Sequence, residues 1–103
     1  MDFKVGELYF MLWHADDAKQ YPNPDAIVFI GKNLEEGVDG EAWYFQDVDS
    51  FCTHGPYSAQ LQRATDVRLF RLNSEDLSQV LDSVELSEEL MNCATLRGQR
   101  TAY

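Results

Sequence analysis

Residues 41–55 read EAWYFQDVDSFCTHG, and the spacing of apolar residues changes in the middle of this stretch. The aromatic-rich first part, residues 41–46, predicts a β-strand. The apolar residues of the second part recur at helical spacing between capping residues: Val48, Phe51 and Cys52, with Asp47 before them and Gly55 and Pro56 after. The stretch therefore predicts a strand that passes directly into a two-turn helix near residues 48–54.

Three other segments have the composition of strands, namely residues 8–13, 26–31 and 67–72. Residues 14–25 are polar and contain two prolines, so we expect a loop there. The acidic, glycine-bearing segment 33–40 is predicted to be the tip of a hairpin that ends with the strand at 41–46. Residues 56–66 are also expected to form a loop.

The C-terminal third is predicted to be helical, because its apolar residues fall at intervals of three and four. In the first predicted helix these residues are Leu77, Val80, Leu81 and Val84. A second helix is expected to begin after Ser87, with three residues turned inward: Leu90, Cys93 and Ala94. The tail after Gly98 is expected to be loose.

Strands first and helices last predict an α+β fold. We expect a small antiparallel sheet of about four to five strands in the N-terminal two-thirds, with two C-terminal helices packed on it; an SH3-like barrel is one such arrangement. The length of 103 residues predicts a single domain, residues 1–103. Within it, residues 1–72 are expected to be mainly β with the short helix, residues 73–97 to form two helices, and residues 98–103 to be a loose tail.

The acidic balance of the chain restricts its partners. The sequence holds 18 acidic and 8 basic residues, a net charge of −10. Residues 1–62 carry 11 acids and 3 lysines, whereas residues 63–103 carry 7 acids and 5 arginines. Such a field repels phosphate backbones and accelerates encounter with cations, so we expect a basic protein partner and no direct binding of nucleic acid. Solubility alone also accounts for an acidic surface.

No apolar run reaches the roughly 18–20 residues of a membrane-spanning helix, and the acidic start lacks the pattern of a secretion signal. These features predict a cytoplasmic protein that does not bind membranes. In that compartment the two cysteines, Cys52 and Cys93, are expected to remain free thiols.

Cys52 and His54 are candidates for a nucleophile and its base, but a helix turns residues two apart about 200° away from each other. We therefore expect Cys52 to pack inward as an inert thiol and His54 to face solvent. The sequence contains no Cys-x-x-Cys, no His-x-x-x-His, no calcium loop and no phosphate loop. It thus predicts no catalytic residue, no metal, no cofactor and no enzyme; a cysteine-dependent enzyme is the least favoured alternative.

Aromatic residues with acids around them form the predicted binding surface. The strand segments 8–13 and 41–46 are apolar on both faces, so part of their aromatic content is core and part is available to line a pocket or an interface. Interfaces are commonly built from aromatic anchors within a charged rim. The predicted partner-binding residues are Trp13, Asp16, Asp17, Glu35, Glu36, Asp39, Glu41, Trp43 and Tyr44.

These observations predict a bacterial-type protein–protein interaction module, an inhibitor or immunity-like protein that docks on a basic partner. The alternative is a small barrel that binds a hydrophobic or planar ligand in an aromatic pocket lined by Tyr9, Trp13, Trp43 and Tyr44. Homo-oligomerisation through a sheet edge or the aromatic face is a further alternative, which the net charge opposes.

Overall fold

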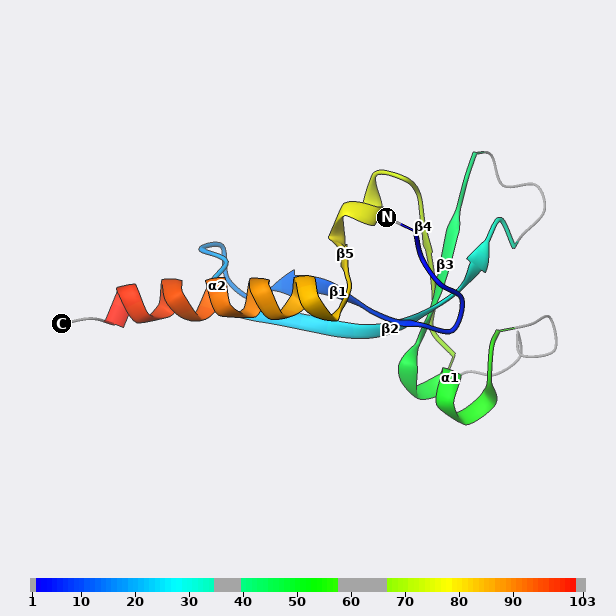
Figure 1. The fold of residues 1–103 in the computed structure, drawn as a ribbon, viewed down its shortest axis with the longest axis horizontal. Helices are drawn as coiled ribbons and strands as arrows, with labels where there is room; N and C mark the ends of the chain where they lie inside the picture. Colours follow the sequence, from blue (N-terminus) through cyan, green and yellow to red (C-terminus); the bar gives the residue numbers. More distant parts are fainter. Residues whose placement is uncertain (1, 35–39, 58–66, 102–103) are drawn as a thin grey trace.

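The computed structural model describes residues 2–34, 40–57 and 67–101. In this part of the chain the elements follow in the order β1 (Leu8–His14), β2 (Pro22–Lys32), β3 (Trp43–Asp47), α1 (Val48–His54), β4 (Leu69–Leu72), the 3₁₀ helix η2 (Asp76–Gln79), β5 (Val80–Leu81) and α2 (Ser83–Thr101) (Figure 1). The four predicted strands and the short helix near 48–54 are confirmed to within a few residues.

All five strands belong to one antiparallel sheet with the order β4–β3–β2–β1–β5. Strands β1 to β4 form a meander, and β5 returns to the free edge of β1, where Val80 lies opposite Met11. The α+β class and the small antiparallel sheet are therefore confirmed. The sheet is open rather than a closed barrel, since β4 and β5 remain at its two edges.

One face of the sheet holds the hydrophobic core. Phe45 of β3 lies in the middle, with its ring centroid 5.2 Å from that of Phe29 and 5.3 Å from that of Phe3. Phe3 belongs to the N-terminal segment, which packs over this face of the sheet. Each of the other four strands contributes buried side chains to the same cluster: Tyr9, Met11, Ile27, Phe29, Leu72 and Val80.

The strand-to-helix corner forms as the sequence predicts. Asp47 ends β3 and caps α1, because its carboxylate accepts hydrogen bonds from the Ser50 backbone N–H at 3.0 Å, from the Ser50 hydroxyl and from the Arg68 backbone N–H at 2.7 Å. Gly55 ends the helix with a φ of 80°, a conformation that favours glycine. The capping carboxylate thereby joins β3, α1 and the start of the segment that leads into β4.

The prediction that Cys52 packs inward is wrong, since Cys52 is exposed and Ser50 is the buried residue of α1. The Ser50 hydroxyl donates to Asp47 and accepts a hydrogen bond from the side-chain amide of Gln46. These bonds hold the hydroxyl against the sheet and turn the thiol outward. His54 is exposed in the last turn of the helix, as predicted.

Replacing Asp47 with alanine is expected to lower the free energy of unfolding by about 2 kcal/mol near neutral pH, because three donors lose their acceptor. Desolvation acts to raise the pKa of the Asp47 carboxyl, but the hydrogen bonds from Ser50 and Arg68 outweigh it and hold the pKa below its usual range. The contribution of the Asp47 carboxylate to stability is therefore complete above about pH 4, the usual pKa of an aspartate in an unfolded chain. It is lost as the pH falls through the lower pKa that Asp47 has in the folded protein. Urea denaturation of both proteins from neutral pH down to about pH 3 measures the difference.

Asp49→Ala is the matched control, since Asp49 is exposed in the first turn of the same helix. Its effect is expected to stay near 0.5 kcal/mol, which is typical of an exposed acid near a helix N-terminus. Equal losses in the two variants would contradict the capping role of Asp47.

β2 begins at Pro22, so the second half of the predicted loop 14–25 is a strand. The two prolines of this segment pair with β1 alone, as in the pair Pro22 and His14, because β3 meets β2 only from Ile27 onward. The bonds from Phe29 to Glu7 and from Ala15 to Tyr21 mark the hydrogen-bonded pairs of this register, so positions 22 and 24 belong to the alternate pairs, whose N–H groups point away from β1. The missing N–H groups of the two prolines therefore remove no hydrogen bond from the sheet. The loop itself shrinks to a turn, closed by a hydrogen bond from the Ala15 N–H to the Tyr21 carbonyl at 2.9 Å.

The first of the two predicted C-terminal helices is absent from the described chain. Asn73 and Asp76 instead form a turn, in which the Asp76 N–H donates to the Asn73 side chain at 2.9 Å. The short helix η2 follows, and Val80 and Leu81 then pair with β1 as β5. The helical spacing of the apolar residues there was misleading, because Val80 is buried as part of a strand.

The second predicted helix is present, but it starts earlier and ends later. Asp82 and Glu85 cap it reciprocally, each side chain accepting a hydrogen bond from the backbone N–H of the other. This capping box begins α2 at Ser83 rather than after Ser87. The helix continues to Thr101, so the predicted loose tail is wrong for residues 98–101, while residues 102–103 lie outside the described residues.

The far end of the β1–β2 hairpin and α2 project together from the rest of the molecule (Figure 1). We call residues 12–26 and 82–101 the stalk, and the other described residues the head. The molecule measures 56 × 29 × 22 Å, and its radius of gyration of 16.0 Å exceeds the roughly 13 Å of a compact chain of 100 residues. Within residues 83–98 of α2, only Leu86 and Cys93 are buried, so most of the helix faces solvent.

Candidate functional site

Of the nine residues predicted to bind a partner, the six that the structure describes do not form one surface. Trp13 lies opposite Asn23 at one end of β2, whereas Trp43 lies opposite Lys32 at the other end. The nine-residue step along the strand corresponds to roughly 30 Å. The acids divide in the same way, with Asp16 and Asp17 next to Trp13 in sequence and Glu41 next to Trp43. The other three, Glu35, Glu36 and Asp39, lie outside the described residues.

The head end of this set is already engaged within the molecule. Tyr44 is fully buried, so its prediction as an interface residue is wrong. Trp43 is half-buried, and the Lys32 ammonium lies 4.8 Å from the centre of its ring. Lys32 also pairs with Glu41 at 2.9 Å. The stalk end is therefore the better candidate for a binding surface.

At the stalk end, Trp13 is 45% exposed and its indole N–H donates to the Asp25 carboxylate at 3.0 Å. Asp16 organises the hairpin turn by accepting hydrogen bonds from the backbone N–H groups of Gln20 and Tyr21. Desolvation acts to raise the pKa of the Asp16 carboxyl, but these two hydrogen bonds outweigh it and lower the pKa. Asp16 is thus a charged residue with a structural role.

A cavity of about 410 Å³ opens between the hairpin, η2 and α2. Its lining residues come from both ends of the chain: Leu12, Trp13, His14, Lys19, Ser78, Gln79, Leu81 and Glu89. This is not the aromatic pocket that the sequence predicted. Tyr9 and Tyr44 are buried. Trp13 of β1 and Trp43 of β3 pair with opposite ends of β2, so they lie far apart.

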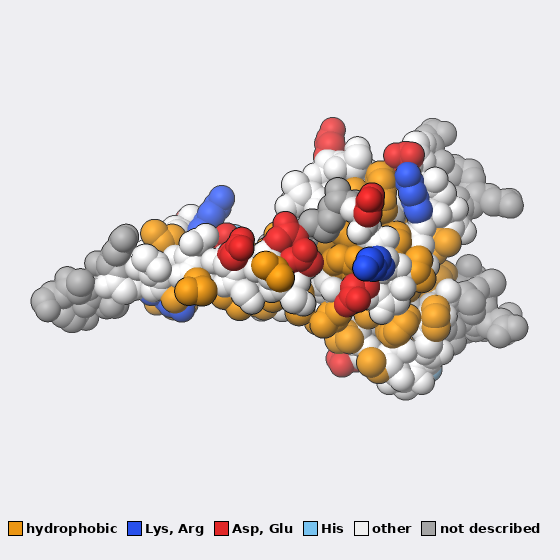
Figure 2. All heavy atoms as spheres, viewed as in Figure 1, with side chains coloured by type: hydrophobic (Ala, Val, Ile, Leu, Met, Phe, Trp, Pro, Cys, Tyr) orange, Lys and Arg blue, Asp and Glu red, His pale blue; other side chains and the backbone are white. Residues whose placement is uncertain are grey.

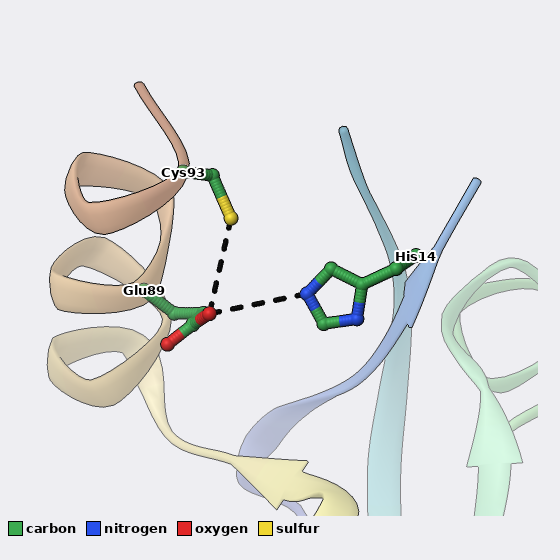
Figure 3. A group of neighbouring side chains, drawn as sticks. All are labelled: His14, Glu89 and Cys93. Carbon is green, nitrogen blue, oxygen red and sulfur yellow. Dashed lines mark hydrogen bonds and ion pairs between the residues drawn. The ribbon is translucent and has the colours of Figure 1, made fainter. Parts of the chain in front are cut away.

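Three side chains with metal-ligating atoms converge beside this cavity (Figure 3). His14 comes from the end of β1, while Glu89 and Cys93 lie one turn apart on α2. Glu89 Oε1 is 3.9 Å from His14 Nε2 and 3.8 Å from Cys93 Sγ, and the ligand atoms all lie within 4.8 Å of one another. His14 Nε2 is buried and has no hydrogen-bond partner among the described residues.

The Cys93 thiol is fully buried and donates to the Lys19 carbonyl oxygen at 3.3 Å. Burial raises the pKa of Cys93, and so do the charge and hydrogen bond of Glu89, while the charge of Arg97 acts in the opposite direction. A protonated, inaccessible thiol beside a carboxylate is a poor nucleophile. The arrangement therefore suits ligand binding better than covalent catalysis.

Cys52 and His54 lie on the confirmed helix α1, so their side chains project about 200° apart. Both side chains are exposed. A thiolate and its base must lie within hydrogen-bond reach of each other. Two residues that are two positions apart on a helix do not meet this requirement.

Sequence reasoning missed the cluster because it looked for ligands closely spaced along the chain. Glu89 and Cys93 do have i, i+4 spacing, which places both on one face of a helix and was the available signal. His14 joins them only because α2 packs beside β1, a contact that no local pattern reports.

The chain matches no family model, and no curated protein or solved structure is significantly similar to it. Neither α1 nor α2, the α-helices of the described residues, is long and apolar enough to cross a membrane. The candidate site is accordingly defined by the geometry of the stalk alone.

Proposed function

We propose that the protein is a small acidic module that binds a basic protein partner through its stalk, in the manner of an inhibitor or immunity protein. The observation that carries this proposal is the exposure of α2, most of whose residues between 83 and 98 face solvent. Helices of globular proteins normally gain most of their stability by packing an apolar face. A partner that covers the stalk would supply the missing packing.

Large hydrophobic side chains are concentrated on this exposed surface. Six of the eight that are exposed in the described chain belong to the stalk: Trp13, Tyr21, Val84, Leu90, Met91 and Leu96. Tryptophan and tyrosine are the residues most often found at the energetic centre of protein interfaces. The hairpin therefore offers aromatic anchors, and the helix offers apolar contacts beside them.

The stalk also carries a net negative charge. Its sequence contains seven acids, Asp16, Asp17, Asp25, Asp82, Glu85, Glu88 and Glu89, against three basic residues, Lys19, Arg97 and Arg100. Figure 2 shows acidic side chains gathered where α2 begins, at the junction with the head. Four of the seven acids come from the C-terminal part of the chain, so the proposed surface is the stalk rather than the N-terminal half. Such a surface attracts a cationic partner and speeds its association.

Binding to the basic partner is expected to weaken as ionic strength rises. Affinity capture from the host lysate at low salt, with elution by rising salt and mass spectrometry, identifies the partner. With that partner purified, the double variant Asp17→Asn, Glu88→Gln is expected to lower the association rate constant several-fold at low salt, because both exposed charges lie on the stalk. Stopped-flow mixing at several salt concentrations measures this rate.

The matched control carries the same change of charge on the head, in the double variant Asp49→Asn, Glu75→Gln. Both of these residues are exposed, and the association rate is expected to remain close to that of the natural protein. A head variant that slows association as much as the stalk variant would show that net charge acts without a defined surface. Capture that is insensitive to salt would remove the proposal altogether.

A further inference from the structure

We propose that His14, Glu89 and Cys93 bind a divalent metal ion of the zinc class. Within the described residues, this is the one group of three histidine, cysteine or acidic side chains whose ligand atoms come close enough to share an ion. The inference goes beyond the proposed function and does not depend on it, because all three ligands belong to this chain, although Glu89 also counts among the acids of the stalk.

The distances approach those of a tetrahedral site. Zinc bonds of 2.0–2.2 Å to nitrogen and oxygen and of 2.3 Å to sulfur place the ligand atoms roughly 3.3–3.6 Å apart. Glu89 Oε1 is already 3.9 Å from His14 Nε2 and 3.8 Å from Cys93 Sγ. The third pair, His14 and Cys93, lies within 4.8 Å, so binding requires the imidazole and the thiol to approach each other by up to about 1 Å through side-chain rotation.

The donor set selects the class of metal. Thiolate and imidazole suit Zn²⁺ and Co²⁺, whereas Ca²⁺ and Mg²⁺ prefer sites made of oxygen ligands. Three protein ligands leave one position of a tetrahedral ion for a water molecule or another small donor. The cavity of about 410 Å³, which both His14 and Glu89 line, has room for that fourth ligand.

His14 Nε2 supplies an independent indication. A buried nitrogen without a hydrogen-bond partner is costly and calls for an explanation in a folded protein. Coordination satisfies that nitrogen in the neutral form of the ring, which is the form that binds metals. The same ion would neutralise the Glu89 carboxylate next to it.

Metal binding requires Cys93 to give up its thiol proton. Burial and the neighbouring Glu89 carboxylate raise the pKa of Cys93, so the thiol keeps this proton in the metal-free protein. The proton passes to solvent as the sulfur–metal bond forms, and the charge of Arg97 nearby favours the resulting thiolate.

The ion would fasten α2 to the hairpin. Two ligands belong to the helix and one to β1. Existing contacts of the helix with the hairpin include the Cys93 thiol, which donates to the Lys19 carbonyl, and the Arg97 guanidinium, which donates to the Gln20 carbonyl and lies 5.6 Å from the centre of the Tyr21 ring. Because binding favours the docked helix, the metal is expected to raise the thermal stability of the protein.

The test is titration of the reduced, metal-free protein with Zn²⁺ in competition with a chromophoric chelator. We expect one ion per chain, release of a proton on binding and a higher melting temperature. Titration with Co²⁺ is expected to give the charge-transfer absorption of a thiolate ligand. His14→Gln is expected to weaken binding by more than about tenfold, and Cys93→Ser is expected to abolish the thiolate absorption.

The chain provides its own controls, since its only other cysteine and histidine are Cys52 and His54 on α1. The variants Cys52→Ser and His54→Gln are expected to bind Zn²⁺ like the natural protein. His14 is only partly buried at the end of a strand, so His14→Gln is expected to fold even if Cys93→Ser does not; circular dichroism checks both. Absence of binding by the natural protein, unchanged affinity in His14→Gln, or loss of binding in the α1 variants would each overturn the proposal.

Discussion

Replacing Phe45 with alanine is expected to lower the free energy of unfolding by about 3–5 kcal/mol. The side chain is fully buried in the centre of the sheet, and its ring lies against three others, those of Phe3, Tyr9 and Phe29. Truncation removes these contacts and leaves a cavity that strands on both sides of β3 prevent from collapsing. Because domains of this size are stable by only about 5–15 kcal/mol, the variant is expected to be close to unfolding.

Urea denaturation followed by circular dichroism measures this loss, with Val5→Ala as the control. Val5 is 71% exposed in the N-terminal segment, and its truncation is expected to change the free energy by no more than about 0.5 kcal/mol. The loss of stability in Phe45→Leu is expected to lie between those of Phe45→Ala and Val5→Ala, since leucine fills part of the space of the phenylalanine ring. A loss below about 1 kcal/mol for Phe45→Ala would mean that the core is not centred on β3.

The sequence correctly predicted the helices and strands that are determined by residues close to them along the chain. The corner at residues 43–55 depends on one capping aspartate and one glycine of positive φ, and the bonds that start and end the helix, from Ser50 to Asp47 and from Gly55 to Phe51, join residues within four positions. The strand β5 could not be predicted in this way. Val80 and Leu81 have helical spacing with the residues before them, and only their pairing with Phe10 and Met11, about 70 positions earlier, makes them a strand.

The stalk could not be predicted for the same reason. Pro22 and Pro24 indicated a loop. β2 tolerates them because this part of the strand extends past the end of β3 and pairs only with β1. The acids next to Trp13 and Trp43 were expected to meet on one surface, and the length of that same strand keeps them apart. The metal-ligating cluster depends on how α2 lies along β1, a packing arrangement that composition and spacing do not encode.

Replacing Gln46 with methionine is expected to lower the free energy of unfolding by about 2–4 kcal/mol, although the two side chains have similar shapes. Gln46 is fully buried, and its amide donates to the Ser50 hydroxyl at 3.0 Å and to the Gly55 carbonyl at 3.1 Å. Its carbonyl oxygen accepts a hydrogen bond from the Tyr57 N–H at 2.7 Å. Methionine leaves the Gly55 carbonyl and the Tyr57 N–H, both partly buried, without this partner. Denaturation of both proteins in urea measures the loss, and Gln79→Met on the exposed side of η2 is expected to be nearly neutral.

The variant Gln46→Glu separates the hydrogen bonds from the packing. An ionised glutamate still accepts from the Tyr57 N–H, but it has no proton to donate to the Gly55 carbonyl, and burial disfavours its charge. Its pKa in the folded protein is therefore expected to lie above the unfolded value of about 4.3. The protonated side chain restores the donor, so the loss of stability relative to the natural protein shrinks as the pH falls and grows as the pH rises through the folded pKa. A deficit of equal size at pH 5 and pH 8 would show that Gln46 acts through its shape and not through its amide.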